Sequence, residues 1–328
     1  LTSDQTGTIA IGKSALTALT SGADNLAIGF TALNANTTAL GNLAIGRNAL
    51  KDLNHANSVR NMGIGAYAGS EMGTADGNQD NIFIGYLAGS GNWHASNASQ
   101  YNVGIGNYVL DEVLDSALKN TAVGHQAGTA IEGGDQNTLL GFQAGVAVVG
   151  GQWNTCVGDR AGDAITSGSA NVAIGTTSDC SATANNQIAI GNGAVTDGAN
   201  KGRWGNASVA TNNIQVDWTV DSDVRIKKDI ENSDIGLSFV NALKTRKYKK
   251  KHPSEYEAEI LEARYKQGGS NYDDDKDEII KDEFDDSKVW NGLVAQEVKA
   301  VMDDIGVEFS GWSEDTKGKQ GIQYSTLV

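Results

Sequence analysis

The chain has 328 residues, with 41 Gly, a single Pro and a formal net charge of −15 at pH 7. Glycine at this frequency indicates many tight corners and is unlike the composition of an ordinary enzyme domain. The acidic balance without a basic stripe disfavours nucleic-acid binding. No apolar run reaches the roughly 20 residues that span a bilayer, and the N-terminus lacks a signal-peptide pattern, so we expect no membrane insertion.

Composition divides the chain at Asp221 and Ser222. Of the 41 Gly, 33 precede this point and 8 follow it, whereas charged residues number 25 in the first 221 positions and 40 in the last 107. Such opposite trends predict two parts with different folds. The two cysteines, Cys156 and Cys180, are too few for a disulfide framework, and we expect free, buried thiols.

Residues 8–191 contain eleven copies of a five-residue core, such as Asn-Leu-Ala-Ile-Gly at 25–29 and Asn-Val-Ala-Ile-Gly at 171–175. Five of the ten spacings between copies are 17 residues and the others are 16 to 21, and a nearly fixed period of this kind is typical of stacked repeats. The copies end at Gly12, Gly29, Gly46, Gly65, Gly85, Gly106, Gly124, Gly141, Gly158, Gly175 and Gly191.

Each column of the repeat has a physical interpretation. The second and fourth positions are mostly apolar, so we expect them to face a core from one side of a short strand, with the small third residue on a closely approached face. The first position is Asn in nine copies, which tolerates a left-handed corner and can stack amides between copies. The closing Gly allows a bend, and the small residue three positions later predicts a second corner or a second short strand.

A single copy cannot bury its own apolar side chains, so the copies must stack about 4.8 Å apart into a rod of about 50 Å. We predict a mainly β fold, a repetitive β-solenoid or β-roll shaft, over residues 1–198, followed by a connecting segment at 199–221. Because the apolar columns are narrow, we expect three chains to share one core, and a monomeric solenoid without a partner is the alternative. An interleaved triple β-helix is a further alternative. The pattern also resembles the head repeats of trimeric autotransporter adhesins and the shafts of phage fibres, a resemblance that implies a homotrimer.

A second set of motifs begins at Ser222, where Ser-Asp-Val-Arg-Ile-Lys-Lys occupies residues 222–228. Ile-Gly-Leu-Ser-Phe-Val-Asn-Ala-Leu follows at 235–243, then Tyr248, Gly-Leu-Val-Ala-Gln-Glu-Val at 292–298 and Tyr-Ser-Thr-Leu at 324–327. This ordered set resembles the intramolecular chaperone auto-processing family that follows phage endosialidases, tail fibres and neck appendages. The resemblance implies a small α+β chaperone domain over residues 222–328.

In that family a Ser and a Lys five residues apart form a dyad, and the chain is cut before the Ser once the trimer has folded. The resemblance therefore implies that Ser222 is the nucleophile, Lys227 the base and Asp221–Ser222 the scissile bond. A hydroxyl is a weak nucleophile until a base takes its proton, and Lys acts as a base when burial or a nearby cation lowers its pKa. Arg225 and Lys228 flank Lys227. The alternative is that Ser222 caps a turn and Lys227 is a solvated charge.

No cofactor and no metal are expected. His55, His94, His125 and His252 lack metal-ligand spacing, and no nucleotide-binding fingerprint is present. The acidic stretch from Asp273 lacks the Gly and Glu spacing of a calcium loop and is interpreted as a solvated insertion.

These features favour a phage tail fibre that attaches the virion to a host and is made in the host cytoplasm. Its expected partners are two further copies of the chain, other tail proteins and a cell-surface glycan or protein receptor, contacted by Trp93, His94 and Tyr101 in the long loops 70–80 and 90–101 and by Trp153 in a later loop. The only enzymatic activity expected is single-turnover self-cleavage. The alternatives are a cellular trimeric adhesin and a polysaccharide-degrading tailspike, although connections of about a dozen residues leave little room for a sugar cleft.

Overall fold

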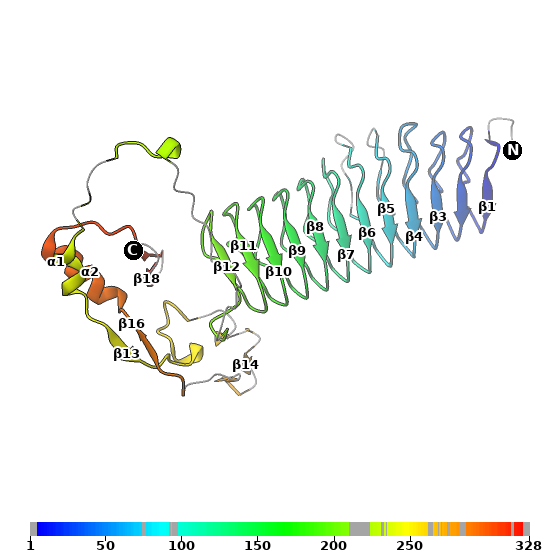
Figure 1. The fold of residues 1–328 in the computed structure, drawn as a ribbon. Helices are drawn as coiled ribbons and strands as arrows, with labels where there is room; N and C mark the ends of the chain where they lie inside the picture. Colours follow the sequence, from blue (N-terminus) through cyan, green and yellow to red (C-terminus); the bar gives the residue numbers. More distant parts are fainter. Residues whose placement is uncertain are drawn as a thin grey trace. The chain divides into compact units, whose positions relative to one another are not determined.

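The computed structural model describes residues 5–73, 77–91, 93, 98–209, 224–230, 233, 235–261, 265–267, 269, 271–273, 276–281, 287–315 and 318–323. The chain forms two compact units, Leu1–Asn206 and Ala207–Val328 (Figure 1). Among the described residues, no helix is both long and apolar enough to cross a membrane.

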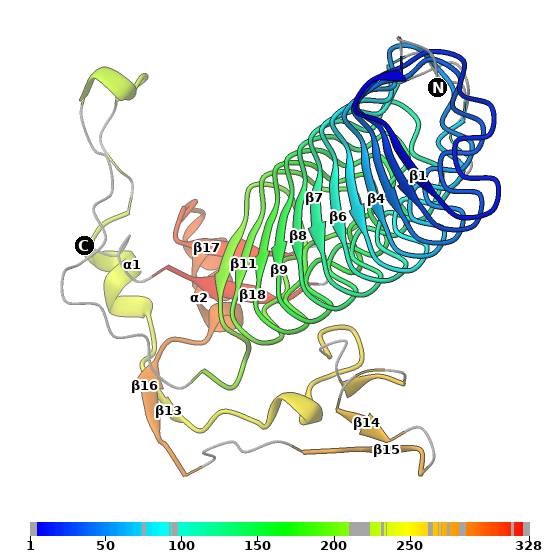
Figure 2. The same cartoon turned by 90° about the vertical axis from the view of Figure 1, so that its right-hand side faces the viewer.

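The first unit is a β-solenoid built around one parallel sheet. Figure 1 shows its strands side by side in chain order, and Figure 2 shows the coils stacked one behind the other. Each strand has three residues. The strands are β1 (Ile9–Ile11), β2 (Leu26–Ile28), β3 (Leu43–Ile45), β4 (Met62–Ile64), β5 (Ile82–Ile84), β6 (Val103–Ile105), β7 (Thr121–Val123), β8 (Thr138–Leu140), β9 (Thr155–Val157), β10 (Val172–Ile174), β11 (Ile188–Ile190) and β12 (Gly202–Trp204).

Every strand pairs with the next strand of the same chain, in register. Ala27 of β2, for example, is the partner of Ala44 of β3, and the same position is paired in each later coil. An interleaved triple helix would place strands of other chains between these two. The predicted mainly β solenoid is therefore confirmed, and the interleaved alternative does not describe this chain.

The sheet has one strand more than the sequence repeat has copies. β12 pairs in parallel with β11, with Gly202 opposite Ile188 and Trp204 opposite Ile190. Its residues lie in the segment predicted to be a connection, and they lack the Asn, Ala and Ile of the repeat. Strand pairing uses backbone N–H and C=O groups, which do not depend on the side-chain pattern, so the repeat search missed this coil.

The interior of the single chain is lined by the third position of the repeat and not by the apolar second and fourth positions. The middle residue of each strand from β2 to β11 is buried within the coil, and Ala27, Phe83 and Leu139 have no exposed surface. In the two end strands, Ala10 of β1 is exposed and Arg203 of β12 is half-buried. The two neighbours of each middle residue point to the opposite side of the strand, because side chains alternate along a strand. The small third position therefore faces the interior of the chain, which is too narrow for larger residues in most coils. The apolar second and fourth positions lie on the outside.

Core volume is shared between the strand and the corner that follows it. Ala27 is followed by the buried Leu33, whereas the larger Leu139 is followed by Gly145. A Cβ at Gly145 would lie 2.6 Å from Leu139 Cδ2, so the two positions occupy the same space. Interiors packed at crystal-like density allow only one large residue at this place in each coil.

The second unit is a small α+β structure with a core of its own. Phe239, Val298, Met302 and Phe309 are buried together, and the Phe239 and Phe309 rings are 5.4 Å apart. Its elements are the 3-10 turn η2 (Val224–Ile226), α1 (Leu237–Ala242), β13 (Arg246–Tyr248), the 3-10 turn η3 (Pro253–Glu255), β14 (Tyr272–Asp273), β15 (Glu278–Ile279), β16 (Trp290–Gly292), α2 (Ala295–Ile305), β17 (Trp312–Glu314) and β18 (Gln320–Ile322). Strands pair antiparallel as β13 with β16, β14 with β15 and β17 with β18.

Candidate functional site

The closing glycines form a column that no other residue can occupy without strain. Gly124 has φ +139°, a conformation that L side chains rarely adopt, and its Cβ would lie 2.2 Å from the carbonyl oxygen of Gly141 in the next coil. The other glycines of the column also have positive φ, and all but the last would clash with the backbone of the next glycine in the column. The predicted role of Gly in closing the strand is confirmed, with close coil stacking as a second reason.

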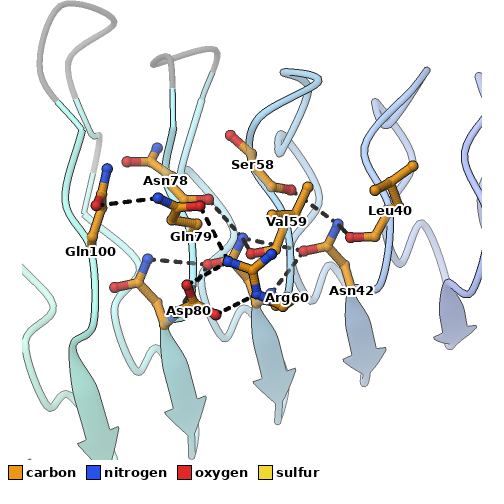
Figure 3. A network of polar contacts seen from close by, with 11 residues as sticks. Leu40, Asn42, Ser58, Val59, Arg60, Asn78, Gln79, Asp80 and Gln100 are labelled. Carbon is orange, nitrogen blue, oxygen red and sulfur yellow. Dashed lines mark hydrogen bonds and ion pairs between the residues drawn. The ribbon is translucent and has the colours of Figure 1, made fainter.

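The asparagines form a buried amide ladder along the sheet, as predicted. Asn42 Nδ2 donates to Ser58 O at 3.0 Å, and Asn42 Oδ1 accepts from the backbone N–H of Asn61 at 2.9 Å (Figure 3). The same two bonds recur in later coils, for instance from Asn120 to Gly134 O at 2.7 Å and from Asn137 N to Asn120 Oδ1 at 3.0 Å. Each amide thus satisfies backbone groups that would otherwise be buried without partners.

The left-handed corner lies one residue earlier than expected. Asn42 and Asn61 themselves have negative φ, whereas Arg60, immediately before Asn61, has φ +59°. The residues immediately before the first position of each copy line one edge of the sheet, and we name them the polar edge. They are Gly7, Asp24, Gly41, Arg60, Asp80, Tyr101, Lys119, Gln136, Trp153, Ala170 and Asn186. Arg60 and Asp80 form a two-pronged ion pair on this edge, at 2.7 Å for both N···O distances (Figure 3).

The outer face of the sheet carries two apolar columns. The exposed fractions of Ile11, Ile105 and Leu140 are 57%, 38% and 47%. We name the second and fourth positions of the repeat the outer face. The first column contains Ile9, Leu26, Leu43, Met62, Ile82, Val103, Thr121, Thr138, Thr155, Val172 and Ile188, and the second Ile11, Ile28, Ile45, Ile64, Ile84, Ile105, Val123, Leu140, Val157, Ile174 and Ile190. The second column is apolar in all eleven coils, whereas the first is interrupted by the three Thr residues. An apolar strip of this length is rare on the surface of a soluble monomer.

A row of rings and one guanidinium follows the closing glycines of seven consecutive coils. We name it the aromatic edge, and its members are Phe30, Arg47, Tyr67, Tyr86, Tyr108, His125 and Phe142. Each contacts the next: Arg47 lies 5.7 Å from the Phe30 ring and 5.8 Å from the Tyr67 ring, and the later ring pairs are 5.5 to 6.2 Å apart. Sequence reasoning missed this row, although aligning the first two positions after each Gly would have found it.

The predicted receptor residues do not form one surface. The Trp93 ring is 2% exposed and packs at 5.7 Å against the core residue Phe83, so the expectation that this ring protrudes is corrected: the longer coil folds it inward, where it fills volume. Tyr101 and Trp153 are exposed, at 46% and 56%, and both lie on the polar edge. Trp153 Nε1 donates to Gln136 Oε1 at 2.6 Å. His94 lies outside the described residues.

Two carboxyl groups meet at a corner of neighbouring coils. Burial raises the pKa of Asp179 to about 7, and the adjacent Asp163 carboxylate contributes to this shift. Burial likewise raises the pKa of Asp163. Asp179 Oδ1 accepts from the backbone N–H of Cys180 at 2.8 Å. The Asp179 carboxyl is therefore only partly ionised near neutral pH.

Both cysteines are free and buried, and burial raises the pKa of the Cys180 thiol to about 11. The pKa of the Cys156 thiol is also raised by burial. Within the described residues, no group of three or more His, Cys, Asp or Glu side chains is placed to hold a metal.

The predicted dyad is described only in part. Asp221 and Ser222 lie outside the described residues, whereas Lys227 is exposed in the segment 224–230, with its backbone N–H donating to Val224 O at 3.1 Å. Val224, Ile226 and Ile230 are each 66% exposed in the same segment. Apolar side chains at this exposure lack a packing partner within the described part of the chain.

In a comparison with protein families, residues 222–307 match the chaperone of endosialidase. The match begins at the serine where the sequence predicted the second module to begin, and it ends before the Tyr-Ser-Thr-Leu motif of 324–327. No curated protein and no solved structure matches the chain. The chain therefore joins a twelve-stranded β-solenoid to a chaperone-of-endosialidase domain.

Proposed function

We propose that this chain is a segment of a phage tail fibre that works as a homotrimer. In this proposal residues 1–221 form the attachment fibre, and the C-terminal domain aligns and folds the three chains. The observation that carries the proposal is the outer face, because two apolar columns run along the sheet on the side away from the chain's own core. The chaperone-of-endosialidase match supports the same conclusion independently.

Three copies around an axis parallel to the solenoid would bury the outer face. Ile105 and Leu140 would then lie against their counterparts in the other copies, where removal of apolar surface from water favours association by about 25 cal/mol per Å². A trimer also explains why the interior of one coil is so narrow. Most of the large aliphatic side chains of the repeat are reserved for contacts between chains.

The repeats alone specify the trimer poorly. A slip of one chain by one coil restores nearly the same contacts, because successive coils present similar side chains on the outer face. A folding domain at one end removes this ambiguity by fixing the three chains at equal height. This gives the C-terminal domain a function that the solenoid cannot supply itself.

The chaperone domain then releases itself. Ser222 Oγ attacks the carbonyl carbon of Asp221, Lys227 accepts the hydroxyl proton, the Asp221–Ser222 amide bond breaks and its nitrogen takes up a proton. Water hydrolyses the resulting ester. Lys227 is exposed in the single chain, so the proposal requires that trimer contacts around Val224, Ile226 and Ile230 desolvate it and make it a base.

We further propose that the mature fibre attaches the virion to a cell-surface glycan or protein receptor, with Tyr101 and Trp153 as the exposed candidates from the sequence. Adsorption of the isolated 1–221 fragment to host cells, and competition of that fragment with phage, would test attachment separately from folding.

The mass of the assembled protein in solution tests the trimer. We expect light scattering to give three chains of 34.3 kDa, or three fibre fragments after cleavage. The variant Ile105→Asp would bring three carboxylates together near the axis and should shift the protein towards monomer. Val149→Asp is the matched control, since Val149 is 39% exposed, close to the 38% of Ile105, but lies outside the outer face. A monomer mass for the parent would overturn the proposal.

A further inference from the structure

We propose that the aromatic edge packs against the polar edge of a second copy of this chain, and that the two edges together set the register of the fibre. The inference rests on the proposed trimer and adds a contact that the outer face does not explain. It assigns a role to the row of rings, which neither the repeat nor the chaperone domain accounts for.

The aromatic edge continues the apolar surface of the outer face. Phe30 follows the second column of that face after a single glycine, and Tyr86 and Phe142 hold the same place in their coils. Their rings are 44%, 42% and 46% exposed. The apolar surface is thus wider on this side of the strands, whereas the polar edge on the other side carries charged groups such as Arg60 and Asp80.

The orientation of the rings favours a protein partner over a sugar. Sugars stack on open ring faces, and here contacts between neighbouring rings cover part of those faces. Tyr86 meets Tyr108 at an interplanar angle of 80°, and His125 stacks on Phe142 at 13°. In each edge-to-face pair the edge of one ring covers a face of the other, and the remaining exposed ring surface suits packing against side chains and cations of another chain.

Symmetry identifies which surface of the second copy is involved. In a ring of three identical chains, each interface joins one surface of a copy to a different surface of its neighbour. An axis parallel to the solenoid places equivalent coils at equal height. A strand only three residues wide leaves both edges beside the shared outer face, so the aromatic edge of one copy meets the polar edge of the next at the same coil.

The residues on the two edges change from coil to coil, and such changes are needed to distinguish the correct register from a slipped one. The aromatic edge covers only the coils from Phe30 to Phe142, and the Arg60–Asp80 ion pair occurs in only one place on the polar edge. A slip of one coil would leave rings opposite unsuitable partners at both ends of the row. The outer face, with its repeated aliphatic residues, penalises the same slip far less.

A cysteine pair in one coil tests the contact. Phe142 and Gln136 are exposed, lie on opposite edges of the coil that contains β8, and are separated by about 15–20 Å of extended chain. A short bismaleimide with a smaller reach cannot join them within one chain. In the purified full-length trimer, the Phe142→Cys/Gln136→Cys double variant should give covalently linked dimers and trimers on a denaturing gel. The native Cys156 and Cys180 are buried and should not react.

The matched control moves one partner along the rod. The Phe142→Cys/Asn186→Cys variant uses the polar edge three coils away, about 14 Å along the axis, and should link far less. Efficient linking of the same-coil pair alone supports the proposal. Equal linking in both pairs, or no linking while light scattering still shows a trimer, overturns it and leaves the aromatic edge open to solvent or a receptor. A monomer mass would instead overturn the proposed function.

Discussion

At the scale of single residues, the solenoid depends on backbone conformations that most side chains avoid. Gly124 combines φ +139° with a carbonyl oxygen 2.2 Å from where its Cβ would be. The variant Gly124→Ala should therefore lower the thermal unfolding midpoint, with a cost of at least about 2 kcal/mol from the strain and the displaced coil. Gly150→Ala is the control, because no atom lies within 4 Å of its Cβ and its φ is not positive. Equal midpoints for the two variants would contradict the role given to the glycine column.

The Asp163–Asp179 pair makes a second prediction at this scale. The pKa of Asp179 is about 7 in the folded chain and about 3.8 when unperturbed, so the folded state holds a proton that the unfolded state loses. The contribution of this carboxyl group to the free energy of unfolding is therefore fully present below about pH 4 and is lost as the pH rises towards 7.

Asp179→Asn keeps the shape, and its amide can donate the hydrogen that the neutral carboxyl supplies. Between pH 5 and pH 8 the parent should lose on the order of 1–2 kcal/mol more stability than this variant does. Thermal unfolding midpoints at the two pH values measure the difference. The control is Asp52→Asn, since 40% of the Asp52 side chain is exposed and Asp52 lies in a distant coil, so its loss should leave the pH dependence of the parent intact.

At the scale of elements, the amide ladder fixes the vertical alignment of strands that are only three residues long. Asn120 is fully buried, donates to Gly134 O and accepts from the backbone and side chain of Asn137. Asn120→Ala would leave those groups without partners, at about 2–4 kcal/mol in total. Asn186→Ala, on an exposed amide, should cost less than about 1 kcal/mol. Urea unfolding midpoints would separate the two, and a small effect at Asn120 would show that the ladder contributes little.

The strands of the repeat were predictable because Asn, Gly and the alternating apolar residues mark each coil. The direction in which the side chains of these strands point was not predictable. A column of Ala and Gly reads equally well as a surface touched by another strand or as the lining of a narrow interior, and the burial of Phe83 and Leu139 decides for the interior. β12 escaped notice because its pairing is carried by the backbone. Trp93 was assigned to the surface because the burial of one ring in a lengthened coil has no periodic signal.

At the scale of the whole molecule, the proposed fibre is held by contacts that recur in every coil, and its assembly needs a domain that is later dispensable. Once the C-terminal domain is removed, the three chains cannot readily find their register again. The persistence of the fibre then depends on a high barrier to unfolding and not on a reversible equilibrium. This requires cleavage to follow folding, since a hydroxyl and an amine five residues apart in a flexible chain have no fixed geometry.

The variants Ser222→Ala and Lys227→Ala should each give intact 328-residue chains that still form trimers, while the parent gives two fragments on a denaturing gel. Lys228→Ala, which changes the neighbouring lysine, should still cleave, because the proposed base is the residue five positions after the nucleophile. The parent should also stay uncut when the trimer is prevented by Ile105→Asp, since Lys227 is exposed in the single chain. Cleavage of the Ile105→Asp variant would show that self-cleavage does not require the trimer. A parent that remains intact after prolonged incubation as a trimer would identify the C-terminal domain as a permanent cap.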